Sequence, residues 1–444
     1  MSAGMSMAGI SPEQGPPLLI PASFFVTAPL AVVAAGGLLI HGGSALLVTR
    51  FAGATAALVH LGTLGLMAMV MLGALYQVIP VVAGATVPFA RGAHAVHAAL
   101  VVSVVALGWG FVGAERLAVV AGGSLLALTF LAFLVPVGIA LARTPVGGPT
   151  VWGMRVAVAG LAWVVGLGVW LAHVRGSGVP SPRYASGLSA HLTTGLVIWI
   201  GGLISGVSFQ VVPMFYLTPA YPRWATRGLV AAFAFSFLAI VALFAVGAEP
   251  TRVALAAAPG ALAAWVVHPV VTLLGASKRR RKRPDPSLWF WQAGLATALL
   301  ALPVGGLALF ADDARFPVLF GWLVLFGWAA MIVHGMLGRI VPFLVWFHRF
   351  SKRVGLEPVP SMKQLLPDRF PRVGFVLHAA TLALGVVAVA SGAAALARAT
   401  GAGLVLTGLA MLAVVVKPLL KAPSTPPPAA GASAPGQTPP GPGR

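Results

Sequence analysis

The chain has 444 residues, of which 59% are hydrophobic and only 8% are charged. Long apolar runs with so few charges are typical of helices that cross a hydrocarbon core, and they exclude a soluble globular protein. Cysteine is absent, which excludes thiolate-ligated haem, iron–sulfur clusters and disulfides. Any metal must therefore bind to histidine, methionine or tyrosine.

Hydropathy predicts an all-α, polytopic membrane bundle of about twelve transmembrane helices over residues 22–420. The expected ranges are 22–47, 55–83, 93–113, 117–142, 152–174, 187–217, 226–247, 251–275, 288–311, 316–346, 373–397 and 399–420. Residues 1–21 contain no basic region of a signal peptide and are expected to be a short cytoplasmic segment. Residues 421–444 are rich in proline, alanine and glycine and are expected to be a disordered tail.

The basic residues predict the orientation of the bundle. Of the 28 Lys and Arg residues, 20 fall after even-numbered helices or in the tail, and only seven fall after odd-numbered helices. Basic loops stay on the cytoplasmic side, so both termini are expected in the cytoplasm. The run Lys278–Arg283 is also typical of a patch that binds anionic lipid or nucleic acid. We prefer the topological explanation for it and expect no nucleic-acid partner.

The acidic residues favour some function classes over others. All eight Asp and Glu residues fall in predicted loops or tails. Transporters that are coupled to protons or sodium usually bind the ion at an intramembrane carboxylate. The sequence therefore disfavours an ion-coupled transporter.

Three predicted helices share a pattern, in which a histidine within an apolar run is followed by a Val-Pro or Ile-Pro pair. The histidine and the proline are His60 and Pro80 in the first of these helices, His191 and Pro213 in the second, and His334 and Pro342 in the third. Each proline is expected to end its helix. A histidine inside an apolar span is costly, so these three are candidate functional residues.

The prolines give a common depth mark. His60 and His191 precede their prolines by 20 and 22 residues, or about 30 Å of helix, whereas His334 precedes Pro342 by only 8 residues, roughly 12 Å. His60 and His191 are therefore predicted to share one outer level. His334 lies deeper, and Trp322 takes the position in its helix that matches His60.

Imidazole is the commonest ligand for haem iron and copper when cysteine is absent. The candidate metal ligands are His60, His191, His334, His41 and His173. A solvated histidine at a helix start, or one that bonds a backbone carbonyl, would give the same pattern. The other histidines, His94, His97, His268, His348 and His378, are expected at the inner interface.

Arg339 follows His334 in the same predicted helix and has no intramembrane carboxylate to pair with. Its side chain is expected to extend to the inner interface. The alternative is that it pairs with an anionic ligand such as a haem propionate.

The twelve-helix layout, with His60 near the outer start of helix 2 and the sequence Gly73-Ala-Leu-Tyr76-Gln-Val-Ile-Pro80 at its end, resembles subunit I of the haem-copper oxidase superfamily. It is also similar to the smaller NnrS family of haem- and copper-containing membrane proteins. The resemblance implies haem or copper as cofactor, with His60 as one axial haem ligand and His334 as the opposite one.

The chain departs from that superfamily in the elements that reduce oxygen. The helix-6 motif His-Pro-Glu-Val-Tyr is absent, and the predicted helix 7 contains no histidine. We therefore expect a bacterial inner-membrane relative without oxygen reduction or proton pumping, with a role in respiratory, nitric-oxide-related or metal and haem metabolism. Its expected partners are the lipid bilayer and other respiratory membrane subunits. The alternatives are a transporter or channel for a small solute, and a scaffold subunit without a cofactor.

Overall fold

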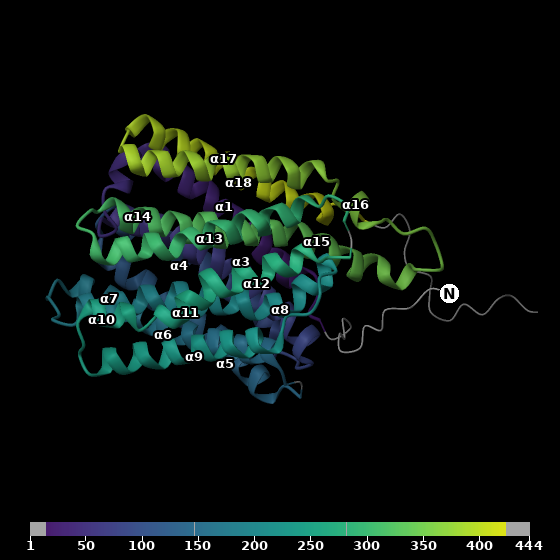
Figure 1. Cartoon of the computed structure of the whole chain (residues 1–444), viewed down its shortest axis with the longest axis horizontal. Coiled ribbons are helices and arrows are strands. Elements are labelled where there is room, and N and C mark those ends of the chain that lie inside the picture. Colours follow the sequence, from purple (N-terminus) through teal and green to yellow (C-terminus); the bar gives the residue numbers. More distant parts are fainter. Residues whose placement is uncertain (1–14, 146, 281, 423–444) are drawn as a thin grey trace, which may run out of the picture.

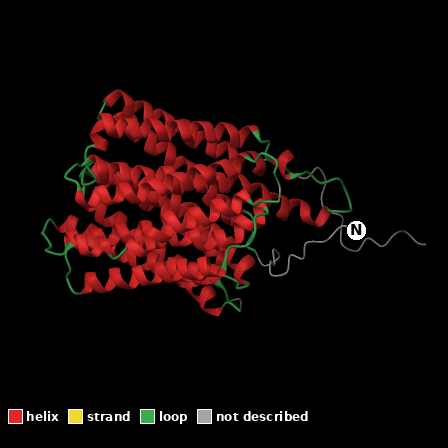
Figure 2. Cartoon of the chain, in the orientation of Figure 1, coloured by secondary structure: helices red, strands yellow, loops and turns green. Residues whose placement is uncertain are grey.

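The computed structural model describes residues 15–145, 147–280 and 282–422. Within these ranges the chain is helical and contains no strand, and short loops join the helices at the two ends of the bundle (Figures 1 and 2). Twelve helical spans are long and apolar enough to cross a membrane, as predicted. The expected tail at residues 423–444 and most of the expected N-terminal segment lie outside the described residues.

The bounds of the twelve spans follow the hydropathy prediction to within several residues. The α-helices within them are α1 (Leu19–Gly42), α2 (Gly53–His60) with α3 (Met69–Val78), α4 (Ala93–Val112), α5 (Arg116–Arg143), α6 (Pro149–Ser177), α7 (Tyr184–Thr193) with α8 (Gly202–Tyr216), α9 (Arg223–Ala245), α11 (Ala258–Leu262) with α12 (His268–Ser277), α13 (Pro286–Phe310), α14 (Arg315–Trp322) with α15 (Met331–Phe350), α17 (Arg369–Ser391) and α18 (Ala394–Leu419). Two short helices, α10 (Pro250–Leu255) and α16 (Met362–Leu365), lie outside the spans.

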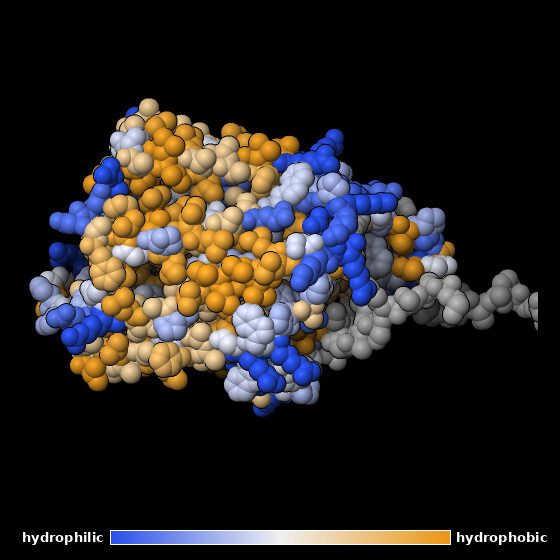
Figure 3. Space-filling model, in the orientation of Figure 1, coloured by the Kyte–Doolittle hydropathy of each residue, from blue (hydrophilic) through white to orange (hydrophobic). Residues whose placement is uncertain are grey.

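The surface matches a bundle that is embedded in lipid. A broad apolar belt covers the side of the bundle, and hydrophilic side chains gather at its two ends (Figure 3). Large apolar residues such as Trp109, Leu117 and Leu238 are exposed, which is favourable only where lipid surrounds them. The chain therefore has the build of an integral membrane protein.

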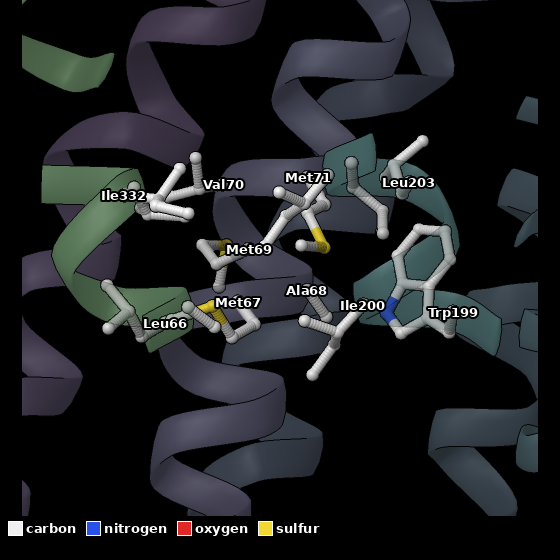
Figure 4. Close-up of a cluster of buried hydrophobic side chains, with 14 of the residues drawn as sticks. Leu66, Met67, Ala68, Met69, Val70, Met71, Trp199, Ile200, Leu203 and Ile332 are labelled. Carbon is white, nitrogen blue, oxygen red and sulfur yellow. The ribbon is translucent and has the colours of Figure 1, made fainter. Parts of the chain in front are cut away.

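The three spans that carry the recurring pattern form the centre of the bundle. In the spans at 53–83, 184–216 and 315–353, 78%, 72% and 56% of the most apolar window is buried, against 22–50% in the other nine. Side chains from all three meet in one apolar cluster, which includes Met69, Ile200 and Ile332 (Figure 4). The recurrence in the sequence thus marks the three central helices.

A π-helical segment of eight residues interrupts each central span at the same level. These segments are Leu61–Ala68, Thr194–Gly201 and Leu323–Ala330. Each begins 19 residues before the proline of its span (61 to 80, 194 to 213, 323 to 342). π-Helical turns leave backbone groups irregularly paired and are frequent at functional sites. Their common position supports a shared scaffold for the three spans.

The prolines do not end the helices, which corrects our prediction. Pro213 and Pro342 lie inside α8 and α15, and Pro80 lies in a five-residue π-helical segment, Ile79–Ala83, that continues α3. A proline removes one backbone donor, and a membrane helix tolerates this loss where local π adjustments or neighbouring helices satisfy the backbone. The recurring Val-Pro and Ile-Pro pairs therefore mark a position within the helix.

Two other boundaries differ from the prediction. The turn between the last two spans falls at Gly392, whose φ of +68° suits glycine, so the predicted helix 373–397 in fact ends at Ser391. The predicted helix 251–275 is broken after Leu255, and only Ala258–Ser277 is long enough to cross a membrane.

The acidic residues lie outside the spans, as predicted. Of the seven within the described part of the chain, four are helix N-cap residues: Glu115, Glu249, Asp285 and Asp368. The positive end of the helix dipole favours a carboxylate at this position. No described span therefore contains a carboxylate in its interior.

Candidate functional site

His60 and His191 lie side by side on two central spans, at the one level that the depth count predicts. Their ring centres are 6.4 Å apart and the ring planes are inclined by only 24°. His60 ends α2 and His191 lies in the last turn of α7, each just before the π-helical segment of its span. The backbone irregularity therefore begins where the two imidazoles meet.

In each ring, Nδ1 forms a hydrogen bond with a backbone carbonyl oxygen. His60 Nδ1–H donates to the carbonyl oxygen of Ala56 at 2.7 Å, and His191 Nδ1–H donates to that of Val164 at 2.9 Å. A carbonyl can only accept, so each Nε2 carries the lone pair in the neutral ring. Within the described part of the chain, the hydrogen bond recorded for each ring is the one at Nδ1. Metal-binding histidines usually show this arrangement, in which Nδ1–H is held by a backbone carbonyl.

The walls of the site hold both rings in place. Phe111 packs on His60 with ring centres 5.2 Å apart. Gly168 of α6 faces His191, and a Cβ atom at this position would lie 2.9 Å from Cε1 of the imidazole. The absence of a side chain at residue 168 thus makes the room for the ring of His191.

Gly168→Val is therefore expected to displace the ring of His191 without removing a ligand. If the pair binds a metal, the variant should lose at least about tenfold in metal affinity, because contacts that orient a ligating imidazole contribute that much. Titration of the purified protein with copper(I) measures the change. Gly166→Val is the control, since nothing lies within 4 Å of a Cβ at residue 166. Equal affinities of the two variants would contradict the role given to Gly168.

The other two outer candidates do not join this pair. His41 and His173 are both exposed, and His173 Nδ1–H donates to Val169 of its own helix. In the described residues there is no group of three or more His, Cys, Asp or Glu side chains that could hold a metal ion. The site therefore offers two imidazoles and no third ligand of these types.

His334 meets a different histidine, which the sequence analysis missed. Its Nδ1 is 3.2 Å from Nδ1 of His378 in α17, and His378 Nε2–H donates to the carbonyl oxygen of Phe326 at 3.1 Å. Because the neutral ring of His378 carries its proton on Nε2, its Nδ1 can only accept, and His334 Nδ1–H is the donor. Phe326 belongs to the third π-helical segment.

The free nitrogen of His334 faces a helix rather than an open site. His334 Nε2 is buried without a hydrogen-bond partner in the described structure. A Cβ atom on Gly374 would lie only 2.9 Å from it. His334 is thus packed against α17 and is not placed beside His60, so His191 takes the position opposite His60.

The interface prediction is wrong for two of the five inner histidines. His378 and His268 are both fully buried. His268 Nε2 is 2.8 Å from Ser208 Oγ, and Tyr221 stacks on its ring. The sequence placed both near helix ends. It could not show that neighbouring helices cover them.

Arg339 pairs with a carboxylate that lies just outside the spans, and no described span offers one, as predicted. It forms an ion pair with Asp285, the N-cap residue of α13, and Nε donates to Ser287 Oγ at 2.7 Å. Tyr216 also contacts these residues. Its hydroxyl donates to Ser287 Oγ, and the guanidinium of Arg339 lies over its ring. Asp285 lies just outside its span in the sequence, and the fold brings it to Arg339.

Breaking this ion pair should destabilise the bundle. Asp285→Asn would leave Arg339, which is 27% exposed, without its carboxylate. We expect a loss of roughly 1–3 kcal/mol, below the cost for a fully buried pair because water reaches this one. Thermal unfolding in detergent measures it. Asp313→Asn is the control, because its partner Arg315 is 62% exposed, and it should leave the unfolding temperature unchanged.

No protein-family model matches the chain, and no curated protein matches it significantly in sequence. The function must therefore be argued from the residues themselves.

Proposed function

We propose that this integral membrane protein binds one metal centre between His60 and His191, with copper(I) as the metal that the two-ligand geometry fits best. The observation that carries the proposal is the pair of imidazoles with both Nδ1 atoms bonded to backbone carbonyls and ring centres 6.4 Å apart. The ring centres are close enough for one metal ion, because an ion about 2 Å from a nitrogen of each ring would hold the centres roughly 6 Å apart. The rings are stacked, so binding would turn the two Nε2 atoms toward the ion.

The number of ligands favours some metals over others. Structural zinc takes four protein ligands, and the described residues offer only two of the usual types here. Copper(I) accepts two nitrogen ligands in a line. Bound copper would supply one-electron chemistry or be carried as cargo.

Haem iron is the second candidate, because it needs only two axial protein ligands. The resemblance to haem-copper oxidase subunit I supports it, although the axial partner of His60 would be His191 in place of the expected His334. We further propose that the protein lies in the bacterial inner membrane with both termini in the cytoplasm. Its role would be in respiratory, nitric-oxide-related or metal metabolism.

Metal analysis and an optical spectrum of the purified protein test the proposal. Protein expressed with copper and a haem precursor should contain about one copper, or one haem with a strong Soret band, per chain. Copper without a Soret band supports the first candidate, and a Soret band supports the second. Protein with neither would refute both and favour a channel or a scaffold subunit.

A further inference from the structure

A cavity of 190 Å³ opens at the end of the bundle that we expect to be cytoplasmic. It lies between the connection from α8 to α9, at residues 217–222, and the last turns of α12. Trp224 and Leu274 line it and are 66% and 58% exposed. Such exposure in a membrane bundle places this side of the cavity against lipid.

The cavity has one apolar wall and one polar end. Val212, Val271 and Leu274 form the apolar wall. Lys278 and Thr218 lie at the polar end, together with Tyr221, whose hydroxyl is 2.9 Å from Thr272 Oγ1. Thr272 Oγ1–H donates to the carbonyl oxygen of His268 at 2.7 Å, so the hydroxyl of Tyr221, whose pKa is raised by burial, donates to Thr272.

One basic residue, Lys278, lines the cavity, and further basic residues are its neighbours in the sequence. Arg223 lies between the lining residues Pro222 and Trp224, and Lys278 begins the basic run of residues 278–283. The backbone N–H of Arg280 donates to the carbonyl oxygen of Leu217 at 3.0 Å, which holds Arg280 against the 217–222 connection. The nearest acidic residue along the chain, Asp285, is paired with Arg339.

We propose that this cavity binds the headgroup and upper acyl chain of one anionic phospholipid. The phosphate would lie at Lys278 and Arg223, and an acyl chain would follow the wall of Val271 and Leu274 between α9 and α12. Basic pockets between membrane helices on the cytoplasmic side are suited to such headgroups. Retention of loops in the cytoplasm accounts for basic residues in this loop, but it does not account for an apolar cavity beside them.

Native mass spectrometry of the delipidated full chain tests the proposal. The probes are phosphatidylglycerol, phosphatidylcholine and inorganic phosphate. We expect phosphatidylglycerol to bind at least about tenfold more tightly than phosphatidylcholine, since each nearby Lys or Arg adds severalfold. Lys278→Gln with Arg223→Gln should reduce phosphatidylglycerol binding about tenfold.

A matched control separates a site from diffuse attraction. Arg91→Gln with Lys352→Gln removes the same charge from exposed residues in two other loops on the expected cytoplasmic side. This double variant should change binding less than twofold. Equal losses in the two double variants would overturn the proposal.

A second variant tests the apolar wall. Gly275→Trp should fit, because nothing lies within 4 Å of a Cβ there, and it should block the acyl chain. Unchanged lipid binding in this variant would overturn the proposal, as would complete displacement of the lipid by inorganic phosphate, which would assign the site to the free ion.

Discussion

Replacing His191 with alanine is expected to lower the copper affinity of the protein by more than about 100-fold, and His60→Ala should have the same effect. Each change removes one of two ligands, which costs more than the roughly 10–100-fold loss seen when only a residue that orients a ligand is removed. Copper titration against a chelator of known affinity measures it. If haem is the cofactor, both variants should lose the Soret band.

The two exposed histidines provide the control for this prediction. His41→Ala and His173→Ala remove imidazoles that are predicted at the same level but stand apart from the pair. Both should leave the affinity unchanged. A loss in these variants equal to that in His191→Ala would mean that the metal is held elsewhere or only adventitiously.

Replacing His378 with leucine is expected to destabilise the bundle by about 1–3 kcal/mol, because it leaves Nδ1–H of His334 buried without an acceptor. It also leaves the carbonyl of Phe326 without the donor that it has now. The change should lower the temperature of thermal unfolding in detergent.

A double-mutant cycle identifies the cause. His334→Leu with His378→Leu removes the donor together with its acceptor, so it should be less destabilising than the sum of the two single variants. Copper affinity at His60 and His191 should stay unchanged in all three variants. Additive losses, or a lost metal, would contradict a structural role for this pair.

The sequence predicts the bundle well because span length and apolarity decide whether a helix can cross a membrane. It also predicts that His60 and His191 share one level, since a helix rises by a constant amount per residue. The rings are neighbours because α2 and α7 belong to two central spans. That adjacency follows from the packing of all twelve helices and cannot be read from one helix.

The sequence fails where a residue's surroundings come from distant parts of the chain. His378 looks like an interfacial residue by its position near a helix start, yet α15 and the π-helical segment before it cover the ring. Arg339 looks unpaired because its carboxylate, Asp285, lies 54 residues earlier, outside the span (285 to 339). The π-helical segments carry no sequence signal that hydropathy detects, and their common distance from the prolines appears only in the structure.

X-ray absorption spectroscopy of the copper-loaded protein tests the metal site most directly. We predict one copper per chain with two imidazole nitrogens at about 2 Å, and the loss of that signal in the variant His60→Ala with His191→Ala. Copper whose ligand environment is the same in wild type and in this double variant would contradict it.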